Sequence, residues 1–225
     1  MIMQKSKSIR RSSRADNMSL AQEYQMRKKR TSRRNMLIIC AMCIVLLGLI
    51  GTYYLTDYLD FAHVNNYPMA YEDVIDKYAD EYQLDSALVC AVVYTESKFD
   101  ANAVSQDGAC GLMQVMPETG EWIAGKLGIS DTYTSDMLFD PDTNVRFGCW
   151  YLNFLFTRYQ GDTRKTLAAY NAGQGNVDKW LTQPECSSDG VSLDHIPFRE
   201  TRNYVKKVKA AHDIYIDLYY SDKAA

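Results

Sequence analysis

Histidine is scarce in this chain, with three residues in 225, and no two of them form a His-x-x-x-His pair. The six cysteines also lack the spacings that are typical of zinc sites. The sequence therefore predicts no metal centre. Cys40 and Cys43 lie in the longest apolar run, and the sequence leaves open whether the other four cysteines pair (Cys90, Cys110, Cys149 and Cys186).

Acidic residues are nearly absent from the first 35 residues, which hold eleven Lys and Arg against two acids. The remainder holds fourteen Lys and Arg against twenty-six acids. The basic segment has no aromatic platform beyond Tyr24, so nucleic-acid binding is not predicted. A basic tail on an acidic body instead indicates that the two parts occupy different compartments.

Charge is missing altogether from residues 36–55, MLIICAMCIVLLGLIGTYYL. A run of about 20 apolar residues can span a bilayer. Basic residues at 27–30 and 33–34 precede it, so the positive-inside rule predicts a single-pass protein of the cell membrane. Its tail, 1–35, would be cytoplasmic and its body extracytoplasmic. A cleaved signal peptide is an alternative, but no clear cleavage site follows. A buried core helix is another, and it would not explain the change in charge.

No β-hairpin signal stands out in the body, which is therefore predicted to be mainly α. We expect a stalk at 56–69, one domain at 70–220 and a short tail at 221–225. Capping residues, prolines and apolar spacing predict helices at 70–83, 85–97, 118–127, 141–159, 163–172 and 200–219. Residues 99–111 and 183–197 are expected to be irregular.

One carboxylate, Glu96, lies at the end of an apolar helix. Leu88, Val89, Val92 and Val93 precede it at spacings that place them on its face. Burial and the negative end of the helix dipole would both raise its pKa. A protonated acid near neutral pH is what general-acid catalysis needs. The alternative is a solvated glutamate at a fraying helix end.

Four short segments follow one another along the chain: ESKF at 96–99, GACGLMQVMP at 108–117, AYNAG at 169–173 and ETRNY at 200–204. Together they resemble the catalytic domain of the soluble lytic transglycosylases, over roughly residues 70–220. The helix that begins at Asp140-Pro141 also resembles the central helix of that family. The resemblance implies a lysozyme-like, mainly helical fold that acts on bacterial peptidoglycan.

Carried onto this chain, the resemblance implies that Glu96 is the single catalytic acid and base. It also implies a set of residues that bind substrate: Ser105, Gln114, Met116, Tyr170, Asn171, Glu200 and Tyr204. Asp100 and Asp107 are candidates for a second carboxylate, but their turn-rich surroundings favour a role in turns.

The implied reaction breaks the bond between N-acetylmuramic acid and N-acetylglucosamine without water and closes a 1,6-anhydro ring. It would need no cofactor or metal. The expected partners are glycan strands, the membrane through residues 36–55, and an envelope or division assembly. A hydrolase of goose-lysozyme type and a wall-binding subunit without catalysis are the alternatives. The sequence leaves open whether cutting is internal or from chain ends.

Overall fold

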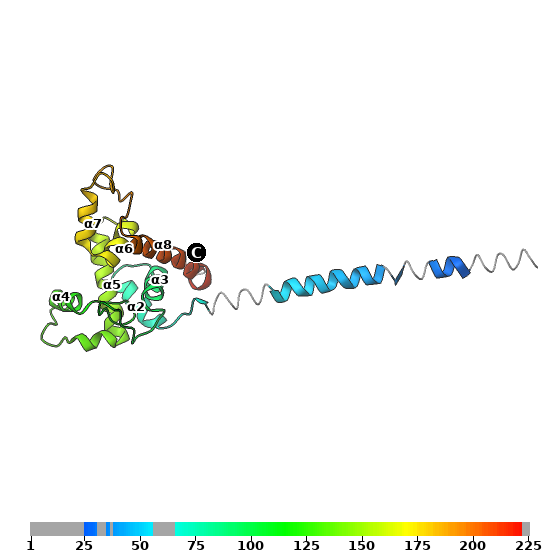
Figure 1. The fold of residues 1–225 in the computed structure, drawn as a ribbon. Coiled ribbons are helices and arrows are strands. Elements are labelled where there is room, and N and C mark those ends of the chain that lie inside the picture. Colours follow the sequence, from blue (N-terminus) through cyan, green and yellow to red (C-terminus); the bar gives the residue numbers. More distant parts are fainter. Residues whose placement is uncertain (1–24, 31–34, 37, 56–65, 222–225) are drawn as a thin grey trace, which may run out of the picture. The chain divides into compact units, whose positions relative to one another are not determined.

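The computed structural model describes residues 25–30, 35–36, 38–55 and 66–221. It divides the chain into two units, Met1–Ala62 and His63–Ala225. In the first unit the helix Ile38–Leu55 has a mean hydropathy of 2.3, and none of it is buried (Figure 1). Among the described residues it is the one helix long and apolar enough to cross a membrane. Most of the expected tail and stalk lies outside the described residues.

The second unit is built from helices. They are α2 (Glu72–Glu81), α3 (Ser86–Ser97), α4 (Pro117–Leu127), α5 (Pro141–Arg158), α6 (Thr163–Ala172), α7 (Gln174–Leu181) and α8 (Arg199–Tyr215). A 3-10 helix, η1 (Ser135–Phe139), precedes α5, and a π-helix, η2 (Ile216–Tyr220), follows α8. The described residues contain no strand, only two isolated bridges that join Cys110 to Val104 and Val115. The prediction of a mainly α fold is confirmed.

The helix ends follow the local chemistry of the sequence. Asp85, Asp140 and Asp162 each accept a hydrogen bond of 2.9 Å from a backbone N–H in the first turn that follows. Such side chains satisfy N–H groups that have no partner within the helix. Pro117 is the first residue of α4, and Gly128 ends that helix with a φ of +71°. The starts predicted for α3, α5 and α6 are therefore confirmed.

The helix α3 forms the centre of the second unit. Seven consecutive residues, 87–93, are buried, so the helix is enclosed on all sides rather than along one stripe. It packs most extensively against α8. The stripe predicted on α8 is buried as expected (Tyr204, Val208, Ala211 and Tyr215). The helix that carries Glu96 is thereby held in the core, mainly by α8.

Three features were not predicted. The helix α7 is short and begins at Gly173, which offers no capping side chain. The 3-10 helix η1 was not predicted either, and α8 changes to a π-helix at Ile216.

The C-terminal end of α8 and η2 hold the segment before α2 in place. The Tyr215 hydroxyl donates to the carbonyl of Pro68 at 2.9 Å, and the Tyr219 hydroxyl donates to the carbonyl of Tyr67 at 2.8 Å. The four cysteines of this unit are buried and free.

Candidate active site

Glu96 lies in the last turn of α3 and is partly buried. The helix ends at Ser97, and the two residues that follow it, Lys98 and Phe99, have φ values of +54° and +65°. The chain therefore turns sharply away from the helix axis. Non-glycine residues rarely adopt this region. The hydroxyl of Ser97 donates to the carbonyl of Leu112 at 2.8 Å. This bond ties the helix end that carries the acid to the loop before α4.

Burial raises the pKa of Glu96 to about 7, and a hydrogen-bonding interaction with Tyr204 opposes that rise. Desolvation penalises the charged carboxylate. The pKa values of Asp85, Asp142, Asp189 and Asp194 are shifted in the opposite direction, below their usual range, mainly by hydrogen bonds that they accept. At neutral pH Glu96 is therefore poised between acid and base.

Two tyrosines face Glu96 from other helices, Tyr170 from α6 and Tyr204 from α8. The pKa of each phenol is raised well above its usual value, first by burial and then by the negative charge of Glu96. The Tyr170 hydroxyl donates to the carbonyl of Met113 at 2.9 Å. The Tyr204 hydroxyl is buried and makes no well-formed hydrogen bond. It lies close enough to the Glu96 carboxyl group to interact with it, but without the geometry of a full hydrogen bond.

The helix α5 holds the loop beside Glu96, residues 110–116, through the side chain of Asn144. Asn144 is fully buried. Its Oδ1 accepts from the N–H of Met113 at 2.7 Å, and its Nδ2 donates to the carbonyls of Cys110 at 2.9 Å and Leu138 at 2.7 Å. A Cβ on Gly148 would lie 2.2 Å from the sulfur of Met113. The loop is therefore fixed by close packing as well as by hydrogen bonds.

Gln114 continues this loop with a φ of +50°. Its Nε2 donates to the carbonyls of Ala103 at 3.1 Å and Gly111 at 3.0 Å. Both amide protons are thus used within the loop, so Oε1 is the atom left for a ligand. Ser105 lies in the preceding turn, where its Oγ accepts from the N–H of Ala109 at 3.0 Å.

The remaining expected residues lie on three different helices. Met116 is the residue before α4 and is half-buried, and Asn171 is half-buried in the last turn of α6. Glu200 is exposed in the first turn of α8, four residues before Tyr204. Among the described residues no hydrogen bond or ion pair links any of these three to Glu96.

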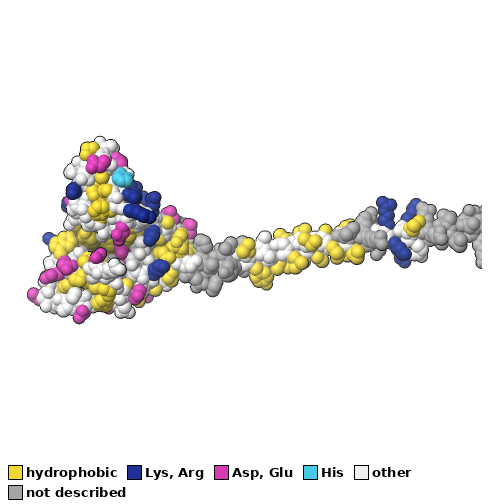
Figure 2. Space-filling model, in the orientation of Figure 1, with side chains coloured by type: hydrophobic (Ala, Val, Ile, Leu, Met, Phe, Trp, Pro, Cys, Tyr) yellow, Lys and Arg dark blue, Asp and Glu magenta, His cyan; other side chains and the backbone are white. Residues whose placement is uncertain are grey.

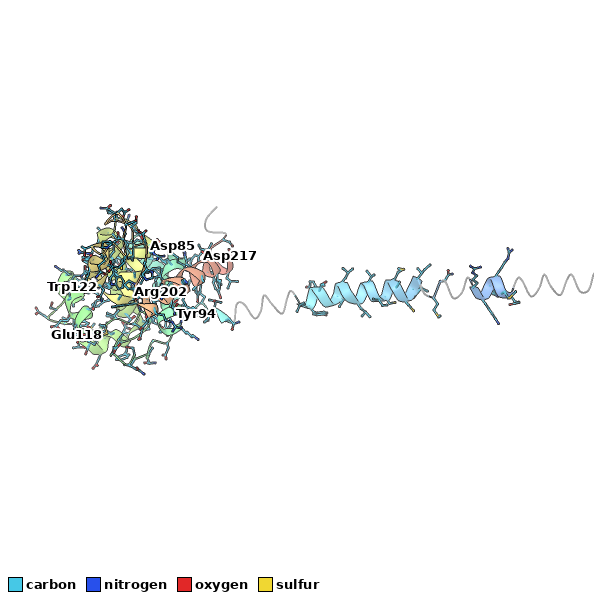
Figure 3. The ribbon with its side chains drawn as sticks, turned by 45° about the horizontal axis from the view of Figure 1, so that its top comes forward. Asp85, Tyr94, Glu118, Trp122, Arg202 and Asp217 are labelled. Atoms are coloured by element: carbon cyan, nitrogen blue, oxygen red, sulfur yellow. The ribbon has the colours of Figure 1, made fainter. Side chains whose placement is uncertain are left out.

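Half-buried aromatic rings continue from Tyr170 toward α4. The ring of Tyr151 lies 5.5 Å from that of Tyr170, and Trp122 lies 6.2 Å from Tyr151. Trp150 and Phe154 pack edge-on against Trp122, at 5.2 and 5.1 Å. Figure 3 labels Trp122 and Glu118 on α4 at one side of the unit and Tyr94 at the other.

Sequence reasoning gave no individual role to Ser97, Asn144 or Tyr151. Asn144 offered one signal, because it is a polar residue on the apolar face of a helix. A fully buried amide needs partners for all its polar atoms. In the described part of the chain, no group of three or more His, Cys, Asp or Glu could hold a metal ion.

Comparison with known proteins gives consistent matches. The family model of the transglycosylase SLT domain matches residues 73–189. The soluble lytic murein transglycosylase of Escherichia coli (strain K12) is 34% identical over 158 residues, which cover 70% of this chain and 24% of that protein. The membrane-bound lytic murein transglycosylase C of Edwardsiella ictaluri (strain 93-146) is 35% identical over 138 residues, 58% of this chain and 38% of that protein.

Solved structures agree with these matches. An inactive Glu-to-Gln mutant of lytic transglycosylase Slt from Pseudomonas aeruginosa has a TM-score of 0.60 at 35% identity, over 67% of this chain and 24% of that one. The 70 kDa soluble lytic transglycosylase in complex with bulgecin A has a TM-score of 0.61 at 30% identity, over 68% of this chain and 25% of that one. The chain thus spans about a quarter of the length of these soluble relatives.

Proposed function

The chain belongs to the transglycosylase SLT domain family, and from that premise we propose that it is a peptidoglycan lytic transglycosylase anchored in the membrane. It cleaves the β-1,4 bond between N-acetylmuramic acid and N-acetylglucosamine and leaves a 1,6-anhydro end on the muramic acid. No water is consumed: the sugar's own C6 oxygen replaces the leaving group at the anomeric carbon, so the reaction is an intramolecular transglycosylation rather than a hydrolysis.

The observation that carries this proposal is the place of Glu96 at the end of the buried helix α3, beside Tyr170 and Tyr204, where burial raises its pKa to about 7. One group that acts first as acid and then as base works best when its pKa is near the working pH. Most glycosidases instead use two carboxylates. The neighbours of Glu96 are two tyrosines, and we assign both the acid and the base role to this one carboxyl group.

In the first step the protonated Glu96 donates its proton to the glycosidic oxygen. The bond from that oxygen to the anomeric carbon breaks, and N-acetylglucosamine leaves with its hydroxyl restored. The substrate's acetamido group stabilises the positive anomeric carbon. In the second step the Glu96 carboxylate takes the proton of the C6 hydroxyl, whose oxygen attacks the anomeric carbon. The proton returns to Glu96, so the enzyme ends as it began.

The surrounding groups support the two states of Glu96 differently. Burial favours the acid, whereas the nearby Tyr204 hydroxyl favours the carboxylate. Glycan would be bound by the residues that the family resemblance implies (Ser105, Gln114 through Oε1, Met116, Tyr170, Asn171, Glu200 and Tyr204). The half-buried rings of Tyr151 and Trp122 offer faces on which sugars pack.

We further propose that the helix Ile38–Leu55 anchors the chain with its N-terminus in the cytoplasm. The support is the basic run at residues 27–30 and the absence of charge within the helix. Ten residues, 56–65, lie between this helix and Asn66, the first described residue of the second unit. A chain of that length reaches at most about 40 Å. The domain would therefore cut only strands that lie close to the membrane.

The test is mass spectrometry of the fragments that the purified full-length chain, in detergent, releases from peptidoglycan. Fragments with anhydro-muramyl ends are the expected product. Free reducing ends would identify a hydrolase of goose-lysozyme type instead. Binding of peptidoglycan without release of fragments would identify a wall-binding subunit.

A further inference from the structure

A second cavity lies at the other end of α3 from Glu96. Its volume is about 600 Å³, within the range of small-ligand pockets. Its lining comes from α3, α5, α6 and α8 and from the turn before α3. An α-helix rises 1.5 Å per residue, so the eleven residues from Asp85 to Glu96 separate the two ends by about 16 Å along the axis. The cavity is therefore distinct from the candidate active site.

The lining of this cavity includes both apolar and amide residues. Leu84, Leu88 and Phe156 are apolar, and Gln83 and Asn153 carry side-chain amides. Amide side chains can pair with peptide N–H and C=O groups, each of which needs a partner when it leaves water. This combination suits a short peptide better than a sugar or a lipid chain.

Charges at the rim of the cavity are not all balanced. Asp85 caps α3 and lies 2.6 Å from Nε2 of His212, so its charge is already engaged. Lys209 and Asp213 of α8 also line the cavity, and neither forms an ion pair within the described residues. A ligand with a carboxylate for Lys209 and a donor for Asp213 would satisfy both.

Positive charge continues from the cavity along α8. Residues 66–221 hold thirteen Lys and Arg against twenty-three acids. Five of the thirteen lie on α8 (Arg199, Arg202, Lys206, Lys207 and Lys209), and none pairs with an acid of the described chain. Arg202, Lys206 and Lys209 share one face because they are three or four residues apart. Figure 2 shows Lys and Arg gathered near the place where Figure 1 labels α8.

We propose that this cavity binds a carboxylate-bearing peptide, with Lys209 on the carboxylate and the basic face of α8 attracting it. The peptide stems of peptidoglycan belong to this chemical class. The proposal rests on the proposed function and adds a second site to it. About 16 Å of helix separates the cavity from Glu96, so the stem would be held well away from the bond that is cut.

The test uses the full-length chain in detergent and two double variants with the same change in charge. Lys206→Gln with Lys209→Gln removes charge beside the cavity. Lys126→Gln with Lys179→Gln, on α4 and α7, is the control. Calorimetry measures the affinity of each for a synthetic stem tetrapeptide with free carboxylates and for the same peptide amidated. We expect the affinity for the tetrapeptide to be about tenfold lower in the first variant, and the wild-type affinity for the amidated peptide to be about tenfold lower as well. The control variant should bind the tetrapeptide as tightly as the wild type does.

A matching activity assay uses glycan strands with and without their peptides. The first variant should raise KM on strands with peptides and leave turnover of peptide-free strands unchanged. Equal peptide affinity in the two variants, or equal affinity for the amidated peptide, would overturn the second site. The second site would also be overturned if the first variant lost affinity for short-chain phosphatidylglycerol but not for the peptide. That result would assign the basic face of α8 to the membrane. If the wild-type chain binds peptide but cuts no strand, it is the proposed function that fails.

Discussion

Replacing Glu96 by glutamine should abolish cleavage and stabilise the folded domain at high pH. Glutamine keeps the shape of the side chain but has no proton to donate. It also carries no charge, so the folded state no longer holds a carboxylate in a poorly solvated place. A residue that the fold tolerates only for the sake of chemistry should show both effects together.

The size of the stability effect follows from the pKa, which burial raises from 4.5 to about 7. That difference corresponds to about 3 kcal/mol, an upper bound because Glu96 is only partly buried. Between these two pH values the folded state binds more protons than the unfolded state. The stability of the wild-type protein therefore falls as the pH rises through this window. The advantage of Glu96→Gln should be small at pH 4 and nearly complete by pH 9.

Thermal unfolding of the full-length chain in detergent, followed by circular dichroism at pH 4 and pH 9, measures this difference. For a domain of this size 3 kcal/mol corresponds to a shift in Tm of roughly 5 to 10 °C. The control is Glu121→Gln, since Glu121 is exposed in the middle of α4. If the two variants showed the same pH dependence, Glu96 would be solvated in the folded state. If Glu96→Gln still released anhydro-muropeptides, its catalytic role would be refuted.

Four further outcomes are expected. The kcat/KM of the wild-type chain should fall about tenfold per pH unit above pH 7, because the acid form of Glu96 is lost; a flat profile to pH 9 would exclude that acid. Tyr170→Phe removes a hydrogen bond to Met113 worth about 1 kcal/mol, so turnover should drop while the circular dichroism spectrum is kept; unchanged turnover would reduce this tyrosine to packing. Asn144→Ala leaves one N–H and two carbonyls unpaired and should cost about 3 kcal/mol in urea unfolding, whereas Gly148→Ala should cost about 1 to 3 kcal/mol by displacing Met113; wild-type stability in either variant would show that α5 does not brace the loop.

Local sequence signals were sufficient for most of the helices. Aspartate caps, a first-turn proline and a terminal glycine act within a few residues, so their effect is visible without the fold. The same signals failed for α7, which starts at Gly173 without a capping side chain. They also failed at Ile216, where the helix continues but its hydrogen-bonding pattern changes to that of a π-helix. Packing, rather than local preference, decides such positions.

The site was predicted less completely than the helices. Glu96 was singled out because it lies at the end of an apolar helical stripe, and the family resemblance implied the roles of the other residues, which stay predictions. The use of both Gln114 amide protons inside the loop could not be predicted, because their acceptors are carbonyls whose positions depend on the loop conformation. The same holds for Asn144, whose partners lie up to 34 residues away.

The sequence by itself determined the family, the mainly helical domain and the apolar helix before it, and it singled out Glu96 as the acid that we propose. These depend on residue types, their order and their local spacing. Only the tertiary structure decided how much Glu96 is desolvated, which tyrosines face it, and which carbonyls hold the neighbouring loop. It also decided that Lys209 borders a cavity at the far end of α3. A pKa and a pocket arise from groups that are distant in the chain, and only folding brings those groups within range of one another.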